Sequence, residues 1–259
     1  MDNYLEKIRN GWNETSDSDW YQSLRAEDKI KRILECPDTA FHPTIYQTIK
    51  KYLPDLSGKR VLLPSSGDNH AAFAFAALGA NVTSSDISDR QLEHARSISE
   101  KHHLNITFIR NDTMRLSQMG DNEFDLVYTS NGTHVWINEL SLMYENIYRV
   151  LKQGGISLMY DIHPFNRPFV GDVGEPKVKK SYNDIAPYLH WRVQDLINAT
   201  AQSRLIIKEM AEMQAVDGSF WYRYEELAAK NEEQLSEVND WKVNPMAALP
   251  AWVSIVAQK

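Results

Sequence analysis

The chain has 259 residues, of which 42% are hydrophobic and 24% charged, and its net charge of −7 argues against nucleic acid as a partner, because phosphate binding needs a concentrated positive surface. A single cysteine, Cys36, excludes an intramolecular disulfide and most structural zinc sites, so no metal is expected. The sequence shows neither an apolar signal core nor a run of membrane-spanning length, which predicts a cytoplasmic protein with no membrane partner.

Residues 1–57 are predicted to form a helical lead-in or cap, interrupted by prolines at positions 37 and 43. From residue 58 onward, apolar strands alternate with helices. The expected strands are 60–64, 81–86, 105–109, 124–130 and 156–162. The expected helices are 69–78, closed by Gly79, a helix with Ser88 as N-cap and Gln91 completing a capping box, and 139–151, stopped by Gly154 and Gly155.

This alternation predicts an α/β fold, a parallel sheet with helices on both faces and with the loops after the strands along one edge. Residues from 163 to about 190 break the rhythm with four prolines and two glycines, and such a long excursion at the functional edge predicts a lid or binding loop. A helix at 191–199, a strand at 204–213, an acidic stretch at 223–240 and a last strand from 252 follow. The last strand is expected to run antiparallel to its predecessor.

Five segments in order carry a resemblance: "VLLPSSGDN", "VTSSDIS", "RNDTMRL", "FDLVYTSNG" and "LKQGGISLMYDI". Together they resemble the motif set of class I (Rossmann-like) S-adenosylmethionine-dependent methyltransferases, over about residues 58–163. The resemblance implies a seven-stranded sheet with an antiparallel last strand, S-adenosylmethionine as cofactor at the strand ends, and a domain spanning 58–259. Within the superfamily the chain most resembles enzymes that act on small molecules, with an N-terminal helical segment over the cofactor.

The first loop has lost most of the glycines that are typical of nucleotide-binding turns. Only Gly67 remains, and Ser65 and Asn69 stand where two further glycines are usual. Asparagine is the side chain that best tolerates left-handed φ, and serine is small, so the turn can still form. A dinucleotide cradle needs the G-x-G-x-x-G pattern, which is absent, whereas S-adenosylmethionine has no phosphate. Ser65, Ser66, Gly67 and Asn69 are therefore expected to bind the methyl donor, although an ordinary strand–helix turn remains the alternative.

Asp86 ends the second strand, 19 residues after Gly67 (86 − 67). An acid at this spacing can accept both ribose hydroxyls, and the alternative is a favourable charge before the next helix. Ile87 would then lie against the adenine. By resemblance, Asp112 accepts a hydrogen bond from the adenine amino group, with Asn111 and Thr113 adjacent; the alternative is an Asx turn at the strand end.

The loop after the fourth strand leaves the sheet edge at the point where strand order reverses and ligands collect. Ser130 and Asn131 are expected beside the methionine part of the cofactor. His134 lies just beyond and is a candidate catalytic residue, with a packed histidine as the alternative.

At the end of the fifth strand, alternation places Tyr160 and Ile162 on one face and Asp161 and His163 on the other. Either pair could face the substrate. An aspartate and a histidine in one cleft make a plausible general base with its orienting partner, so Asp161 and His163 are the remaining catalytic candidates. The alternative is a loop-forming aspartate and a histidine fixed by Pro164.

Two other functions share the strand–loop–helix–strand–acid layout. The first is an NAD-dependent oxidoreductase, which the missing glycine pattern disfavours. The second is a non-catalytic S-adenosylmethionine-binding protein, which the altered first loop suggests. The ordered motifs favour a methyltransferase that acts on a small molecule, and they leave the acceptor open.

Overall fold

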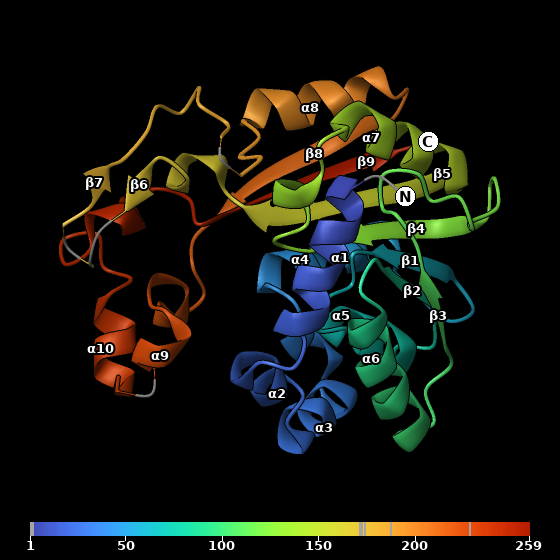
Figure 1. Cartoon of the computed structure of the whole chain (residues 1–259), viewed down its shortest axis with the longest axis horizontal. Helices are drawn as coiled ribbons and strands as arrows, with labels where there is room; N and C mark the ends of the chain where they lie inside the picture. The colour runs from blue at the N-terminus through green and yellow to red at the C-terminus, as the bar shows by residue number, and fades with distance from the viewer. Residues whose placement is uncertain (1–2, 171–172, 174, 187, 228) are drawn as a thin grey trace.

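The computed structural model describes residues 3–170, 173, 175–186, 188–227 and 229–259. Its centre is a seven-stranded sheet in the order β3-β2-β1-β4-β5-β9-β8 (Figure 1). The strands are β1 (Arg60–Pro64), β2 (Asn81–Asp86), β3 (Ile106–Arg110), β4 (Phe124–Thr129), β5 (Leu151–Ile162), β8 (Ile206–Met213) and β9 (Trp252–Gln258). From β3 to β5 all neighbours are parallel, and β9 runs antiparallel to both β5 and β8. The predicted mostly parallel sheet with an antiparallel last strand is confirmed.

Helices cover both faces of the sheet (Figure 1). One face carries α3 (Glu27–Glu35), α4 (Pro43–Tyr52), α5 (His70–Ala77) and α6 (Asp89–Lys101), and the other carries α7 (Leu140–Val150) and α8 (Val193–Gln202). The alternation along β1 explains the two layers, because Val61 and Leu63 join the core beneath α5 whereas Leu62 joins the core beneath α7. Fully buried side chains such as Phe73 each contribute roughly 1.5–3 kcal/mol.

The turn between β1 and α5 forms despite its missing glycines. Asn69, the residue before α5, takes a left-handed φ of 65°, and Ser65 takes 54°. The expectation that asparagine can replace a glycine in this turn is confirmed.

The capping box predicted for α6 is half right. Ser88 Oγ accepts a hydrogen bond from Gln91 N–H at 3.1 Å, as an N-cap should. The reciprocal bond is absent, because Ser88 N–H donates to Asp86 Oδ1 instead and the Gln91 side chain accepts from Arg25 of the N-terminal segment. The Gln91 side chain, which the local pattern assigned to the capping box, is instead bonded to a residue far away in the sequence.

The predicted stop of α7 at Gly154 and Gly155 is wrong. The helix ends at Val150, and β5 begins at the next residue. Leu151 pairs with Phe124, while Leu126 already pairs with Ile156, so the intervening residues bulge out of the ladder. Gly154 supplies the positive φ of 78° that this irregularity requires.

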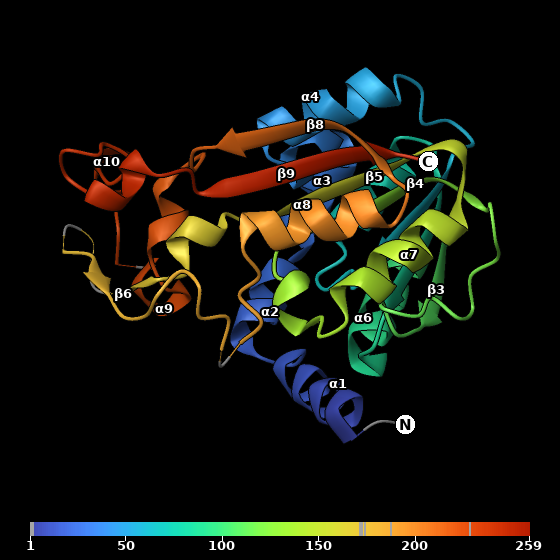
Figure 2. The same cartoon turned by 90° about the horizontal axis from the view of Figure 1, so that it is seen from above.

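The N-terminal segment consists of α1 (Asn3–Thr15), α2 (Asp19–Leu24), α3, the 3₁₀ turn η1 (Pro37–Ala40) and α4. Figure 2 shows α1 beside α6, at the edge of the molecule. Asn13 Oδ1 accepts hydrogen bonds from Ser88 Oγ at 2.7 Å and from Arg90 N–H at 3.2 Å. Asp17, just after α1, pairs with His94 of α6 at 2.7 Å. These contacts hold the helical segment over the ends of the strands, and the domain boundary at residues 57 and 58 stays a prediction.

A smaller group of elements gathers at one end of the sheet (Figure 1). It comprises η3 (Pro164–Asn166), β6 (Phe169–Val170), β7 (Lys177–Val178), η4 (Gly218–Trp221), α9 (Tyr224–Leu227), α10 (Glu232–Glu237) and η5 (Pro245–Ala248). Trp20 of α2 stacks on Tyr224 of α9, with ring centroids 6.0 Å apart, and so links this group to the N-terminal helices. The lid function of the excursion from residue 163 stays a prediction, and residues 171–172, 174 and 187 of it lie outside the described part. None of the helices in the described ranges has the length and apolar character needed to cross a bilayer.

Candidate active site

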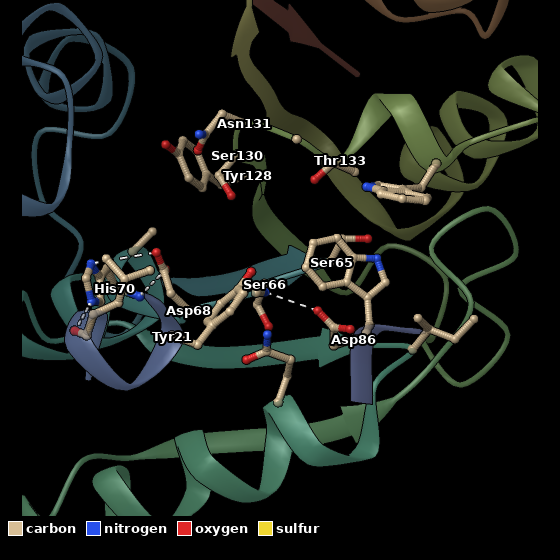
Figure 3. Close-up of a pocket in the computed structure, with 18 of the residues that line it drawn as sticks. Tyr21, Ser65, Ser66, Asp68, His70, Asp86, Tyr128, Ser130, Asn131 and Thr133 are labelled. Carbon is tan, nitrogen blue, oxygen red and sulfur yellow. Dashed lines mark hydrogen bonds and ion pairs between the residues drawn. The ribbon is translucent and has the colours of Figure 1, made fainter. Parts of the chain in front are cut away.

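A cavity of about 260 Å³ opens where β1, β2 and β4 end (Figure 3). The loop after β1 lines it with Ser65–Asp68, the end of β2 with Asp86 and Ile87, and the loop after β4 with Ser130–Thr133. The N-terminal helices complete its walls, with Trp12 and Tyr21 among their lining residues. Ligands of open α/β sheets bind at such a reversal of strand order, here between β1 and β4.

The loop after β1 is held from beneath by hydrogen bonds. Ser66 Oγ lies 2.7 Å from Ser84 Oγ of β2, and Ser84 in turn donates to Asn69 Oδ1. Asn69 Nδ2 donates to the carbonyl oxygen of Gly67 at 2.8 Å. Asn69 is fully buried and does not belong to the cavity lining, so its part is to shape the loop, while Ser65, Ser66 and Gly67 face the cavity.

Asp86 projects into the cavity from the end of β2 (Figure 3). It is 7% exposed, and its two oxygens accept hydrogen bonds from Gly67 N–H at 3.1 Å and Ser88 N–H at 2.9 Å. Burial raises the pKa of this carboxyl, and the backbone N–H groups oppose that rise. A carboxylate has about four lone-pair sites, so each oxygen retains the capacity to accept a further hydrogen bond from a ligand.

The three residues after β3 lie behind this cavity and are not among its lining residues. Thr113 Oγ1 reaches the site through a contact of 2.7 Å with Ser65 Oγ. Asp112 Oδ1 accepts from Met114 N–H at 2.9 Å, which is the Asx turn that the sequence left open. Asp112 Oδ2 and Asn111 Nδ2 are both buried without a hydrogen-bond partner, although Arg115 Nε lies 3.4 Å from Asp112 Oδ2. A donor without a partner and an acceptor held only by Arg115 are the kinds of group that pair with the edge of a purine base, and both lie outside the cavity lining.

The loop after β4 is held by Asp161, which is 4% exposed. Asp161 Oδ1 accepts from Gly132 N–H at 2.9 Å, and Oδ2 accepts from His134 Nδ1 at 2.9 Å. His134 Nε2 lies 3.2 Å from the hydroxyl of Tyr144, so both ring nitrogens have a polar partner. Burial acts to raise the pKa of Asp161, but the bond from His134, its charge and the Gly132 N–H outweigh burial and lower it.

The three predicted catalytic residues are not among those that line the main cavity. Asp161 and His134 border a separate hollow of about 20 Å³ together with Arg167 and His190. His163 is fully buried and pairs through Nε2 with Glu212 at 2.9 Å, and burial lowers its pKa although Glu212 opposes this. His163 and Asp161 therefore follow the same face of β5, as alternation predicted, but it is Tyr160 that reaches the cavity.

Several cavity residues were not assigned a role from the sequence. Asp68 follows Gly67 directly and His70 begins α5, so their position in and beside a nucleotide-binding turn was an available signal. Trp12 comes from α1, where no motif marks it, and it packs edge-on against Trp136 at 5.5 Å. Tyr128, the penultimate residue of β4, was not singled out either.

The charges around the cavity are one-sided. Of the lining residues, Asp68 and Asp86 are carboxylates, and none within the described chain is a lysine or arginine. Aromatic rings from both the sheet and the N-terminal helices form much of the wall. Such a site favours a positively charged ligand, because carboxylates and ring faces both attract cations.

Comparisons with known proteins agree with this geometry. Residues 61–155 match the family described as "Methyltransferase domain". The chain is 30% identical over 139 residues to the uncharacterized methyltransferase YbaJ of Bacillus subtilis (strain 168), a match that covers 54% of this chain and 54% of that protein. The chain thus spans about half the length of this curated relative.

Solved structures share the fold at low sequence identity. An S-adenosylmethionine-dependent methyltransferase from Mesorhizobium loti has a TM-score of 0.59 at 19% identity, over 83% of this chain and 97% of that one. Phosphoethanolamine N-methyltransferase 2 of Haemonchus contortus, solved in complex with S-adenosyl-L-methionine, has a TM-score of 0.59 at 18% identity, over 93% of this chain and 60% of that one.

Proposed function

Since the chain carries a class I, Rossmann-like S-adenosylmethionine-dependent methyltransferase domain, we propose that the protein transfers the methyl group of S-adenosylmethionine to a small-molecule acceptor. One observation supports this proposal above the others: the carboxylate of Asp86 projects into the cavity from the end of β2. There it has spare acceptor capacity for the two hydroxyls of a ribose.

The residues around the cavity fit the other parts of the methyl donor. Ile87 follows Asp86 in the lining and would contact the adenine, whose edge suits the polar groups of Asn111 and Asp112, with Thr113 linking them to the loop. The methionine part would pass along Ser65, Ser66 and Gly67, with Ser130 and Asn131 on the facing side. When bound, this cofactor supplies a methyl group already activated on a sulfonium.

The protein's own contribution is then to hold and orient the reacting groups and to exclude water from them. Reacting groups must be aligned at about 3 Å, and an aromatic, water-poor wall favours a reaction in which positive charge on sulfur is lost. Trp12, Tyr21 and Trp136 form such a wall, in edge-to-face contacts of 5.5 to 6.3 Å.

Asp161, His134 and His163 contribute to this reaction indirectly, because they hold the loop after β4 and the end of β5 in place. Asp161 fixes Gly132 and His134, and therefore fixes the loop that lines the cavity between them. The Tyr144 hydroxyl contacts the far nitrogen of His134 and so helps to fix the orientation of its ring. His163 ties the end of β5 to Glu212 of β8.

The charge of the cavity disfavours a nicotinamide dinucleotide. Its pyrophosphate carries two negative charges, which would find no lysine or arginine among the described lining residues. S-adenosylmethionine carries a net positive charge and is favoured for the same reason.

The test is a thermal-shift comparison followed by a transfer assay. At 100 times its dissociation constant, S-adenosylhomocysteine should stabilise the protein by about 2.7 kcal/mol, and NAD should stabilise it far less. Methyl-labelled S-adenosylmethionine with a pool of small metabolites should then give a labelled product. Donor binding with no labelled product from any pool would leave only a binding protein, and preferential stabilisation by NAD would overturn the proposal.

A further inference from the structure

Two buried tyrosines turn their hydroxyls toward the cavity without a partner. Tyr128 at the end of β4 is 2% exposed and Tyr160 near the end of β5 is 9% exposed, and both line the cavity. The ring of Tyr128 is fixed against Phe41 and Phe75, at 5.8 and 5.6 Å. Within the described ranges neither hydroxyl has a hydrogen-bond partner. The two side chains are buried, but neither hydroxyl oxygen is itself fully buried, so both oxygens are open to the cavity and can contact a ligand.

Asp68 faces the same space as Tyr128. Its negative charge acts, after burial, to raise the pKa of the Tyr128 hydroxyl, which places the carboxylate near that ring. Asp68 Oδ1 accepts a hydrogen bond from His70 N–H at 2.9 Å, and Oδ2 lies 3.8 Å from His70 Nδ1 (Figure 3). This leaves one carboxylate oxygen without a close partner at the side of the cavity opposite Asp86.

His70 has one nitrogen fixed and one free. Nε2 lies 2.8 Å from the carbonyl oxygen of Leu24, and because a carbonyl only accepts, Nε2 carries a hydrogen. In the neutral ring Nδ1 is then the basic nitrogen, and it faces the Asp68 carboxylate.

We propose that the methyl acceptor is an amine, whose nitrogen is held by Asp68 and by the hydroxyl of Tyr128, and that His70 takes up the proton which the amine must lose. This inference rests on the proposed function. An ammonium group offers three N–H donors: Asp68 and the Tyr128 hydroxyl can accept two of them, and His70 Nδ1 can accept the third. Rings such as Trp20 and Tyr21 in the same wall favour a cation further, whereas a carboxylate or phosphate acceptor would be repelled by Asp68.

The proton and electron balance is closed by groups already present. An amine that enters as ammonium gives one N–H proton to His70 Nδ1, which leaves an imidazolium beside Asp68. The freed lone pair forms the bond from nitrogen to the methyl carbon, while the electron pair of the carbon–sulfur bond stays on sulfur. The methylated product keeps the positive charge that the sulfonium loses.

The experiment measures amine selectivity in protein saturated with S-adenosylhomocysteine. The probes are n-propylamine, n-propanol and propionate, which are similar in size and differ in charge, with affinities taken from ligand-observed NMR titrations. We expect n-propylamine to bind at least ten times more tightly than n-propanol, and propionate to bind more weakly than either. Equal affinities, or a preference for propionate, would overturn the inference.

Variants separate the acceptor subsite from the methyl donor, which also carries an ammonium group. Asp68→Asn should weaken the affinity for n-propylamine at least ten-fold and leave the affinity for S-adenosylhomocysteine within two-fold of the wild-type value. The matched control is Asp121→Asn, at an exposed position. The reverse result, with weakened S-adenosylhomocysteine and unchanged amine binding, would assign Asp68 to the donor and overturn the inference. Tyr128→Phe should lower amine affinity in the same direction as Asp68→Asn.

His70 is tested by a split between binding and transfer. His70→Gln should keep the n-propylamine affinity within three-fold while methyl transfer to the amine falls at least 100-fold. Unchanged transfer would overturn the role of His70. If wild-type protein fails to bind S-adenosylhomocysteine at all, the proposed function fails, whereas binding of S-adenosylhomocysteine without amine selectivity overturns only the inference about the acceptor.

Discussion

Asp161→Asn should destabilise the fold by an amount that its contacts define. The carboxylate is 4% exposed and accepts from Gly132 N–H and His134 Nδ1, both at 2.9 Å, and from Ile162 N–H at 2.8 Å. An asparagine amide retains one acceptor oxygen, but it turns an NH₂ group toward the His134 donor. Losing this charge-assisted bond inside the core should cost about 3 kcal/mol. For a chain of this size that lowers Tm by roughly 6–12 °C.

The pH dependence of this loss provides the assay. Because the pKa of Asp161 is lowered in the folded protein, its stabilising contribution is present above the ordinary carboxyl pKa of about 4 and is lost as pH falls through the folded-state value. Urea unfolding should therefore show the full gap between wild type and variant at pH 7 and a smaller gap below pH 4. A variant within about 0.5 kcal/mol of wild type at pH 7, a typical effect for a surface substitution, would refute the assigned role of Asp161.

Two further substitutions test the loop and the excursion. Asn69→Ala should destabilise the protein more than Asn69→Gly in thermal unfolding. Both variants lose the hydrogen bonds to Gly67 and Ser84, but only alanine is also strained at the left-handed φ of 65°, by about 1–2 kcal/mol. Equal losses of stability in the two variants would contradict this reasoning. His190 has a pKa lowered to about 4, first by burial and then by Arg167, so its contribution to stability is full above pH 6.5 and is lost as pH falls toward 4. His190→Gln should show less loss of stability than wild type between pH 6.5 and 5 in urea unfolding, and parallel curves would contradict the assignment.

The sequence predicted the sheet well because its strands are marked locally. The second strand, Asn81–Asp86, and the first, Arg60–Pro64, match the expected ranges residue for residue. Each is a short apolar run bounded by turn residues, and the alternating helices then leave few topologies. Asp86 could be placed for the same reason, since its position follows from the end of a strand.

The misassigned features depend on contacts between distant parts of the chain. The side chain of Gln91 accepts a hydrogen bond from Arg25, 66 residues away, and does not bond to the backbone of the N-cap residue. The bulge before Ile156 depends on the pairing of β5 with β4. Alternation correctly separated Tyr160 from Asp161, but it cannot tell which face of the strand meets the cavity. That choice depends on where the N-terminal helices and the loop after β4 come together.

The acceptor side was missed because its residues look ordinary in the sequence. Tyr128 reads as a core residue of β4, and only its unpartnered hydroxyl at the cavity distinguishes it. Asp68 stands in a loop that was interpreted as a donor site alone, and His70 begins the helix after it. Their relation to Tyr128 appears only when the ends of β1 and β4 lie side by side.

The most direct test of the account is the affinity of S-adenosylhomocysteine for Asp86→Asn, measured by isothermal titration calorimetry. Removing the charged acceptor of two ribose hydroxyls should weaken binding by about 1.5–3 kcal/mol, or roughly 10- to 150-fold. Asp89→Asn, the same change three residues further on and outside the cavity lining, should bind like wild type. Equal affinities for wild type and Asp86→Asn, with both proteins folded, would contradict the claim that this cavity holds the methyl donor through its ribose.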